Sequence, residues 1–192
     1  MAKKKTTTQD LPEEIPSSFT PQGYRPADPT TDRPALWSTE PEVARLILAI
    51  AANTNAKTIV EVGCFRGATT AQLAESGLEI HAVDIHPELP PMPPNVTVHT
   101  GDSIAIANSR LLPKADIIFY DSTHTFKHLQ AEFRAYEVNV AAKGCVHVFH
   151  DAIHMPEVAA FLRWLERWYN ITTINTTENR GVAIAVFRRA YA

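Results

Sequence analysis

The sequence is short of several features that would mark particular classes of protein. Its 192 residues contain only two cysteines and seven glycines, and the net charge is −3. Two cysteines without CxxC spacing exclude a disulfide framework and favour free thiols in a reducing compartment. No run approaches the roughly 20 apolar residues of a membrane span, and the N-terminus lacks an apolar signal segment. We therefore expect a cytoplasmic protein with no membrane partner.

Basic residues are not clustered either. The only basic run is residues 3–5, three lysines close to the N-terminus, and so short a run is typical of a solvated tail. The slightly acidic balance of the chain gives no general attraction to a phosphate backbone. The sequence therefore predicts no nucleic-acid partner.

Composition divides the chain into two parts. Residues 1–35 are rich in proline, serine, threonine and charge, and such a segment cannot bury enough apolar surface to offset the entropy of ordering. We predict a flexible N-terminal arm over 1–35 and one folded domain over 36–192. A domain of about 150 residues buries roughly 70% of its unfolded surface, which is enough for an independent core.

Within the domain, short apolar runs alternate with segments of helical spacing. For strands the criterion is a short run of β-branched and other apolar residues bounded by glycine or polar residues. For helices it is apolar residues three and four positions apart. The predicted strands are 58–63, 79–85, 95–103, 115–121, 145–151, 170–175 and 181–189, and the predicted helices are 39–54, 67–77, 103–111, 129–140 and 156–170. This alternation indicates an α/β fold with a mostly parallel sheet, in which the last two strands add an antiparallel hairpin.

Three boundary signals accompany these elements. Thr39 and Glu42 have the spacing of a capping box at the start of the first helix. Asp102 or Ser103 can cap the helix after the third strand. Gly144 can end the helix that precedes the fifth strand.

The first predicted strand ends in a glycine-containing loop, EVGCFRGATT. A dinucleotide fingerprint, GxGxxG, would need glycine at the position of Phe65, because the backbone must approach a pyrophosphate there. The loop still turns tightly between Gly63 and Gly67 and leads into a helix N-terminus, which favours an anion. It therefore suits a carboxylate better than a diphosphate.

Two acids follow at the ends of the next strands. Asp84 ends the second strand about 20 residues after the loop, where a carboxylate accepts hydrogen bonds from both hydroxyls of a ribose. Asp102 ends the third strand in the sequence GDS and is placed to address an adenine edge. A site for a ribose, an adenine and an amino-acid carboxylate, with no place for phosphate, fits S-adenosylmethionine.

Residues 38–190 resemble a class I S-adenosylmethionine-dependent methyltransferase. The features that carry the resemblance follow one another in the chain: ExGxxxG, a threonine pair, Asp84, the GDS turn and the terminal hairpin. More narrowly, EVGCFRGATT, DSTH and FHD are similar to the small O-methyltransferases of the macrolide and cephalosporin-tailoring type. The resemblance implies a Rossmann-like doubly wound sheet of seven strands in the order 3-2-1-4-5-7-6. It also implies cofactor contacts from the loop and the strand ends, at Glu61, Gly63, Cys64, Phe65, Gly67, Thr69, Asp84, Asp102, Ser103 and Asp121.

The fourth and fifth predicted strands both end in groups that bind protons or cations, in FYDSTH and VHVFHD. If these strands are neighbours, about 4.8 Å apart, their tips bring Asp121 close to His150 and Asp151. The resemblance implies that these three residues hold a divalent cation, and that His124 is the catalytic base beside a catalytic Asp121. Carboxylates with water favour Mg²⁺, whereas an imidazole ligand favours Mn²⁺, Fe²⁺ or Zn²⁺.

The implied function is metal-assisted O-methylation of a small hydroxylated molecule, such as a sugar, polyketide or phenol. A non-catalytic protein that binds S-adenosylmethionine with the same fold is the alternative. No lid domain is inserted, so acceptor specificity must come from short loops such as 86–95 and 152–156 or from the N-terminal arm. A homo-oligomer could complete the pocket. Structural roles are alternatives for three site residues: Asp121 as a helix cap, His124 as a helix residue without chemistry, and His150 as a neighbour of the ligands.

Overall fold

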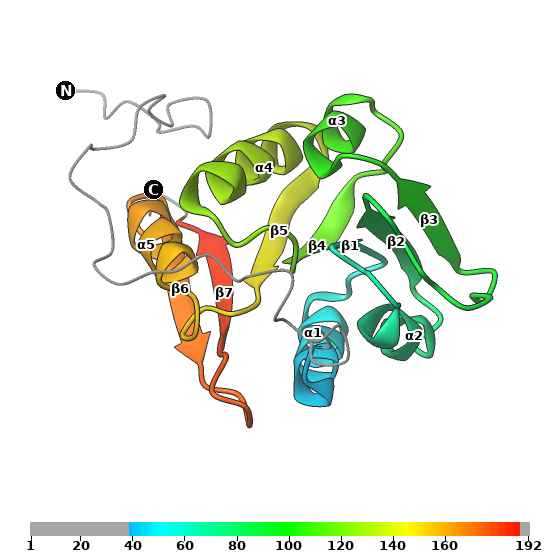
Figure 1. Cartoon of the computed structure of the whole chain (residues 1–192), viewed down its shortest axis with the longest axis horizontal. Coiled ribbons are helices and arrows are strands. Elements are labelled where there is room, and N and C mark those ends of the chain that lie inside the picture. The colour runs from blue at the N-terminus through cyan, green and yellow to red at the C-terminus, as the bar shows by residue number, and fades with distance from the viewer. Residues whose placement is uncertain (1–38, 189–192) are drawn as a thin grey trace.

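The computed structural model describes residues 39–188 (Figure 1). Along the chain the elements are α1 (Pro41–Thr54), β1 (Thr58–Val62), α2 (Ala68–Ala74), β2 (Glu79–Asp84), β3 (Val96–Thr100), α3 (Ser103–Asn108), β4 (Ala115–Tyr120), α4 (Phe126–Asn139), β5 (Ala141–Phe149), α5 (Pro156–Leu165), β6 (Tyr169–Ile174) and β7 (Val182–Phe187). The seven strands form one sheet in the order β3-β2-β1-β4-β5-β7-β6. The predicted fold class and strand order are confirmed, whereas the predicted arm at 1–35 lies outside the described residues.

The sheet is parallel except at one edge. The pairs β1–β2, β2–β3, β1–β4 and β4–β5 are parallel, and β7 runs antiparallel to both β5 and β6. The chain moves outward from β1 to β3 and then crosses back to β4 on the other side of β1. The strand order therefore reverses between β1 and β4, and ligands of such sheets bind at the carboxyl ends of the strands at this point.

Helices cover both faces of the sheet. Figure 1 shows α1 and α2 on one face and α3, α4 and α5 on the other. All five residues of β1 are buried, and they alternate between the two cores: Ile59 packs on the α1 side and Val60 on the α4 side. A strand covered on both faces reads as a continuous apolar run, as the sequence does here. Among residues 39–188 no helix has the length and apolar character to cross a bilayer.

The predicted capping box at the start of α1 is wrong. Glu40 is the N-cap residue, and no side chain caps the helix. The Thr39 hydroxyl instead donates to the carboxylate of Asp121, and Glu42 accepts hydrogen bonds from Thr177. Both side chains are occupied by partners far away in the sequence. The predicted cap of α3 is confirmed, because Asp102 accepts a hydrogen bond from the Ala105 amide at 2.8 Å.

The prediction for Gly144 is also wrong. Helix α4 already ends at Asn139, and Gly144 lies inside β5 with a φ of +87°. The pairing of β4 with β5 shifts register here, because Ala115 pairs with Ala141 but Ile117 pairs with Val146. Glycine adopts the left-handed conformation at little cost, so it fits this irregular stretch of the strand.

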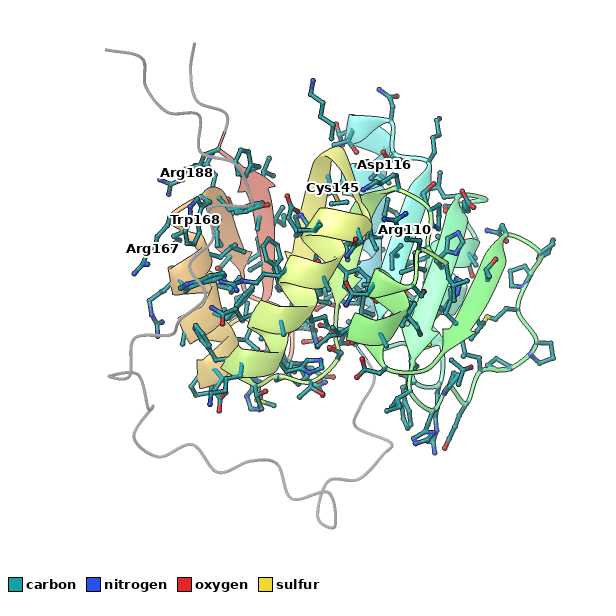
Figure 2. The ribbon with its side chains drawn as sticks, turned by 90° about the horizontal axis from the view of Figure 1, so that it is seen from above. Arg110, Asp116, Cys145, Arg167, Trp168 and Arg188 are labelled. Atoms are coloured by element: carbon teal, nitrogen blue, oxygen red, sulfur yellow. The ribbon has the colours of Figure 1, made fainter. Side chains whose placement is uncertain are left out.

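At the amino end of the sheet, Asp116 has a structural role. One carboxylate oxygen of Asp116 accepts hydrogen bonds from the amides of Lys57 and Thr58, at 2.7 and 3.2 Å. These bonds tie the start of β1 to β4. Figure 2 shows Asp116 beside Cys145 at this end of the molecule.

Candidate active site

The site begins where β4 and β5 end. The Asp121 amide donates to the Val62 carbonyl at 2.8 Å, and the His150 amide donates to the Tyr120 carbonyl at 3.0 Å. The sheet ladder thus continues one residue past each strand. Asp121 and His150 therefore lie side by side at the carboxyl edge, and Asp151 follows directly.

Gly63 brings the first loop against this edge. Its φ is +92°, and a Cβ placed on it would lie 2.3 Å from the carbonyl oxygen of Asp121. Real Cβ atoms do not approach that closely, so only glycine fits. The end of β1 and the end of β4 are therefore packed backbone to backbone at the reversal of strand order.

Asp121 is held from three directions. Its Oδ2 accepts a hydrogen bond from the Thr39 hydroxyl at 2.5 Å, and its Oδ1 lies 3.0 Å from Nδ1 of His150. Burial alone would raise the pKa of this carboxyl group, but the charges of His150 and His124 and the hydrogen bond with His150 lower it well below its usual range. Asp121 is thus a fixed carboxylate anion. It does not cap α4, whose N-cap is Thr125.

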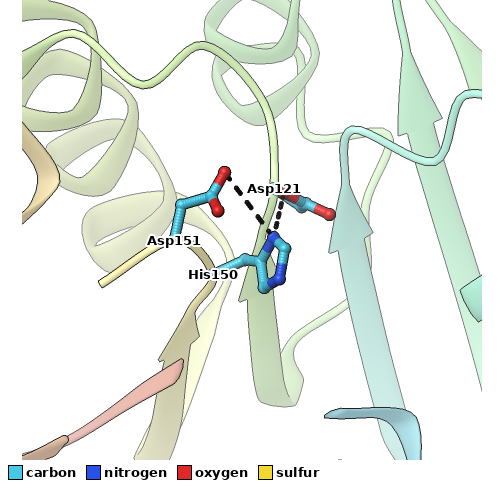
Figure 3. A group of neighbouring side chains, drawn as sticks. All are labelled: Asp121, His150 and Asp151. Carbon is cyan, nitrogen blue, oxygen red and sulfur yellow. Dashed lines mark hydrogen bonds and ion pairs between the residues drawn. The ribbon is translucent and has the colours of Figure 1, made fainter. Parts of the chain in front are cut away.

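His150 has a carboxylate at each ring nitrogen. Nε2 lies 2.7 Å from Glu40, while Nδ1 lies 3.0 Å from Asp121 and 3.8 Å from Asp151 (Figure 3). Burial disfavours the charged ring, but Asp121 first and then Asp151 and Glu40 outweigh it and raise the pKa of His150 to about 9. Sequence reasoning missed Glu40, because the contact joins residues 110 positions apart.

Asp151 has a left-handed backbone conformation, and one of its carboxylate oxygens lacks a hydrogen-bond partner among residues 39–188. Its φ is +54°, in the left-handed region, which Asp adopts more readily than most residues with a side chain but still uncommonly. Its Oδ1 is buried and has no hydrogen-bond partner among residues 39–188. Burial raises the pKa of this carboxyl group. An unsatisfied buried oxygen of this kind suits a ligand that carries positive charge.

Asp121, His150 and Asp151 together fit a divalent cation. Each offers one ligand atom, and the three atoms all lie within 4.8 Å of one another. Two carboxylates and an imidazole are donors that divalent ions accept. The sequence placed these three groups together correctly, and their role as ligands stays a prediction.

His124 faces the same carboxylates. Its Nε2 lies 3.3 Å from Asp151 and 3.5 Å from Asp121, but this buried nitrogen makes no well-aligned hydrogen bond within residues 39–188. Burial opposes the charged ring, and the two carboxylates outweigh it and raise the pKa of His124. The residue lies in the turn before α4, which begins at Phe126. His124 is therefore not a helix residue, and its side chain is directed at the site.

On the other side of the reversal point, Asp84 ties two loops together. Its Oδ2 accepts a hydrogen bond from the Phe65 amide and its Oδ1 one from the His86 amide, both at 2.8 Å. Each carboxylate oxygen can accept a second hydrogen bond. The half-buried Asp84 is thus oriented by backbone and can still accept hydrogen bonds from the hydroxyls of a ligand.

Several predicted cofactor residues lie in the first loop or in the strand and helix that flank it. Glu61, Cys64, Gly67 and Thr69 are buried. The Glu61 carboxyl group accepts a hydrogen bond from Thr70 at 2.6 Å, and burial raises its pKa to about 8. A Cβ on Gly67 would meet Met92 and Leu89, at 2.5 and 2.8 Å, so this glycine admits the 86–95 loop. These buried residues determine the conformation of the loop through packing and hydrogen bonds. A direct contact with a cofactor stays a prediction for each of them.

A second missed residue, Glu132, connects the two sides. It is completely buried on α4 and accepts hydrogen bonds from the hydroxyls of Ser103 at 2.5 Å and Ser122 at 2.8 Å. Ser103 follows the exposed Asp102 in the turn after β3, and Ser122 follows Asp121 in the turn after β4. Glu132 therefore links the turn predicted to face the adenine with the turn that carries the predicted cation ligand Asp121.

Comparison with known proteins agrees with this geometry. Residues 60–152 match the family model described as a methyltransferase domain. No curated protein matches the chain in sequence. The matched segment runs from β1 to the residue after Asp151, so it includes every predicted site residue.

Solved structures share the fold at low sequence identity. The O-methyltransferase TomG from Streptomyces achromogenes, involved in tomaymycin synthesis and solved with S-adenosylmethionine, has a TM-score of 0.62 at 15% identity, with 80% of this chain and 82% of that one covered. An O-methyltransferase from Bacillus cereus, solved with S-adenosylhomocysteine, has a TM-score of 0.57 at 15% identity, with 80% and 84% covered. A methyltransferase from Geobacter sulfurreducens has a TM-score of 0.61 at 16% identity, with 81% and 82% covered. At these identities the likeness establishes the fold.

Proposed function

We propose that this chain is a class I S-adenosylmethionine-dependent methyltransferase that methylates a hydroxyl oxygen of a small molecule with the help of a divalent cation. The observation that carries the proposal is the meeting of two half-sites where the strand order reverses. A loop of the type that binds S-adenosylmethionine begins at Gly63, and Asp121, His150 and Asp151 gather directly beside it.

The cofactor side of the proposal depends on the ends of the first three strands. Asp84 is oriented by two backbone amides and would accept the ribose hydroxyls. Asp102 and Ser103, held through Ala105 and Glu132, would face the adenine. The loop from Gly63 to Gly67 would then hold the amino-acid part. In this arrangement the sulfonium would lie near the reversal point, beside Asp121.

The reaction itself requires alignment and proton removal. The acceptor oxygen forms a bond to the methyl carbon while the bond from carbon to sulfur breaks, so S-adenosylhomocysteine leaves and the hydroxyl proton must be taken up. Holding the two reacting groups in line can supply roughly 7–11 kcal/mol. A divalent cation at Asp121, His150 and Asp151 would lower the pKa of an acceptor hydroxyl.

His124 is the proposed base. Its Nε2 lies within 3.5 Å of both carboxylates, whose negative charge raises its pKa. When that charge is neutralised, burial alone acts on the ring and lowers its pKa. Nε2 can then accept the acceptor proton near neutral pH.

The acceptor side is bordered by short loops. The 86–95 loop packs on Gly67 through Leu89 and Met92, and residues 152–154 are held by backbone bonds to Arg180 and Gly181. Exposed Ile85 and Ile153 offer apolar surface near the strand ends. These features favour a small acceptor with apolar parts.

Formation of S-adenosylhomocysteine tests the proposal whichever hydroxylated molecule is the acceptor. The protein is incubated with S-adenosylmethionine, Mn²⁺ or Mg²⁺ and a panel of phenols, sugars and polyketides, and the acceptor is examined for a mass gain of one methylene. We expect cofactor turnover that depends on an acceptor and is lost in chelator. Cofactor binding without turnover on any acceptor would indicate a binding protein instead.

A further inference from the structure

Glu40 is a buried carboxylate directly before α1, and it is 3% exposed. Its Oε2 lies 2.7 Å from Nε2 of His150, and its Oε1 accepts a hydrogen bond from the Thr176 hydroxyl at 2.6 Å. The Thr176 oxygen in turn accepts a hydrogen bond from the Gly181 amide at 2.9 Å. Glu40 is thus fixed in one orientation between α1 and the turn of the terminal hairpin.

The contact with Glu40 fixes the role of one ring nitrogen of His150. An ionised carboxylate only accepts hydrogen bonds, so Glu40 keeps hydrogen on Nε2, and Asp121 accepts hydrogen from Nδ1 as long as no cation is bound. A cation that displaces the hydrogen of Nδ1 would bind the lone pair on this nitrogen, which faces Asp121 and Asp151 (Figure 3). Proteins orient metal-binding imidazoles in this way, with a carboxylate on the far nitrogen.

Asp151 gives an independent indication that a ligand belongs here. Its side chain is 9% exposed, and its Oδ1 has no hydrogen-bond partner in the described part of the chain. Burying a carboxylate oxygen without a donor is costly. Asp151 also belongs to the same group of donor atoms as Asp121 and Nδ1 of His150.

We propose that Glu40 is a positioning residue that holds His150 so that Nδ1, together with Asp121 and Asp151, binds a first-row transition ion such as Mn²⁺, Fe²⁺ or Zn²⁺ in preference to Mg²⁺. This inference rests on the cation site of the proposed function and specifies the class of ion. An imidazole among the ligands favours these ions, whereas Mg²⁺ prefers oxygen ligands and water.

Glu42 supplies a matched control. It lies two residues from Glu40 and also ties α1 to the hairpin turn, because its carboxylate accepts hydrogen bonds from the amide and the hydroxyl of Thr177. These bonds do not involve the imidazole. Glu42→Gln therefore perturbs the same contact between elements and leaves His150 untouched.

Calorimetric titration of the metal-free full chain with MnCl₂ or MgCl₂ tests the proposal, with neither cofactor nor acceptor present. We expect the wild type to bind Mn²⁺ about tenfold or more tightly than Mg²⁺. A glutamine amide can donate as well as accept, so Glu40→Gln no longer fixes hydrogen on Nε2 and should weaken Mn²⁺ binding about 10- to 100-fold. Glu42→Gln should leave both affinities within about twofold.

A spectroscopic measurement covers the case in which Glu40→Gln does not fold. Long-range ¹H–¹⁵N spectra of the wild type loaded with diamagnetic Zn²⁺ should show hydrogen on Nε2 of His150 and metal on Nδ1. Equal affinity for Mn²⁺ and Mg²⁺, identical behaviour of the two glutamine variants, or hydrogen on Nδ1 would each overturn the proposal. Failure of the proposed function gives a different result, namely Glu40-dependent Mn²⁺ binding without turnover on any acceptor.

Discussion

One imidazole lies in β5 and a second directly after it, and their surroundings differ in one decisive respect. His147 lies in the core, with Nε2 2.8 Å from Glu137 and Nδ1 3.2 Å from the Tyr120 hydroxyl. His150, three residues later at the strand tip, also has a carboxylate 2.7 Å from Nε2, but its Nδ1 faces two further carboxylates. A buried imidazole–carboxylate pair is therefore not by itself a sign of function.

The two histidine–carboxylate pairs differ in the groups that surround them. The rings of Phe133, Tyr120 and Tyr169 surround His147 and close the core around it. Beside His150 the neighbouring Asp151 has a left-handed backbone and a buried oxygen without a partner among residues 39–188. In the first arrangement both ring nitrogens of His147 have partners within the core, whereas the second gathers more negative charge than the side chains there neutralise. We take this surplus as the mark of the site.

The largest effect is expected from Asp121→Asn. The change removes a cation ligand and the partner of His150, so turnover should fall about 10³-fold or more, roughly 4 kcal/mol of transition-state stabilisation. S-adenosylhomocysteine formation in saturating Mn²⁺ measures the loss. Glu137→Gln alters the core pair instead and should keep turnover within about threefold, whereas a similar loss in both variants would remove the distinction between the two regions.

The pH dependence of stability should report the charge of His150. The pKa of His150 is raised to about 9 in the folded protein, against about 6.5 in an unfolded chain. The stabilisation, up to about 3 kcal/mol, is therefore fully present below pH 6.5 and is lost as the pH rises through 9. Glu61, with a pKa raised to about 8, acts in the same direction at lower pH.

Urea unfolding of the cation-free protein at a series of pH values measures this dependence. Between pH 8 and 9 stability should fall more steeply in the wild type than in His150→Gln, in which the upper part of the Glu61 titration remains. An unchanged slope in this variant would show that the charge of His150 is not stabilised by its carboxylates.

A smaller effect is expected from His147→Asn. This change leaves Glu137 buried without its partner and should cost about 2 kcal/mol of unfolding free energy, measured in urea. Titration with Mn²⁺ should give an unchanged affinity, whereas His150→Asn should lower it about tenfold or more. Loss of cation affinity in both variants would mean that the core pair also supports the site.

The smallest effect concerns the cofactor side. Asp84→Ala should weaken binding of S-adenosylhomocysteine by about tenfold or more, at least about 1.4 kcal/mol, as measured by calorimetry. Asp116→Ala is the matched control, because Asp116 also accepts two backbone amides but at the opposite end of the sheet. Equal affinities for the two variants would show that the ribose is held elsewhere.

Much of this molecule could be predicted from its sequence because the informative signals are local or repeat along the chain. Alternating apolar runs indicated the sheet, and acids at the ends of successive strands indicated Asp84, Asp121 and Asp151. The ladder of a parallel sheet brings such tips together whatever the loops between them do.

What could not be predicted depends on contacts between distant segments. Glu40 and Thr39 have the sequence of an ordinary helix start, yet they bond to His150 and Asp121 across the fold. Glu132 has the appearance of a polar helix residue but is completely buried between two serine hydroxyls. No spacing rule reports these partners, because each depends on how the helices are placed on the sheet.

The central claim is that two adjacent strand tips hold a cation next to the cofactor. Anomalous diffraction from a crystal soaked with Mn²⁺ and S-adenosylhomocysteine tests it most directly. We predict a manganese peak bound by Asp121, Nδ1 of His150 and Asp151, with the ribose on Asp84. Bound S-adenosylhomocysteine without such a peak, and with His150 still hydrogen-bonded to Asp121, would contradict the claim.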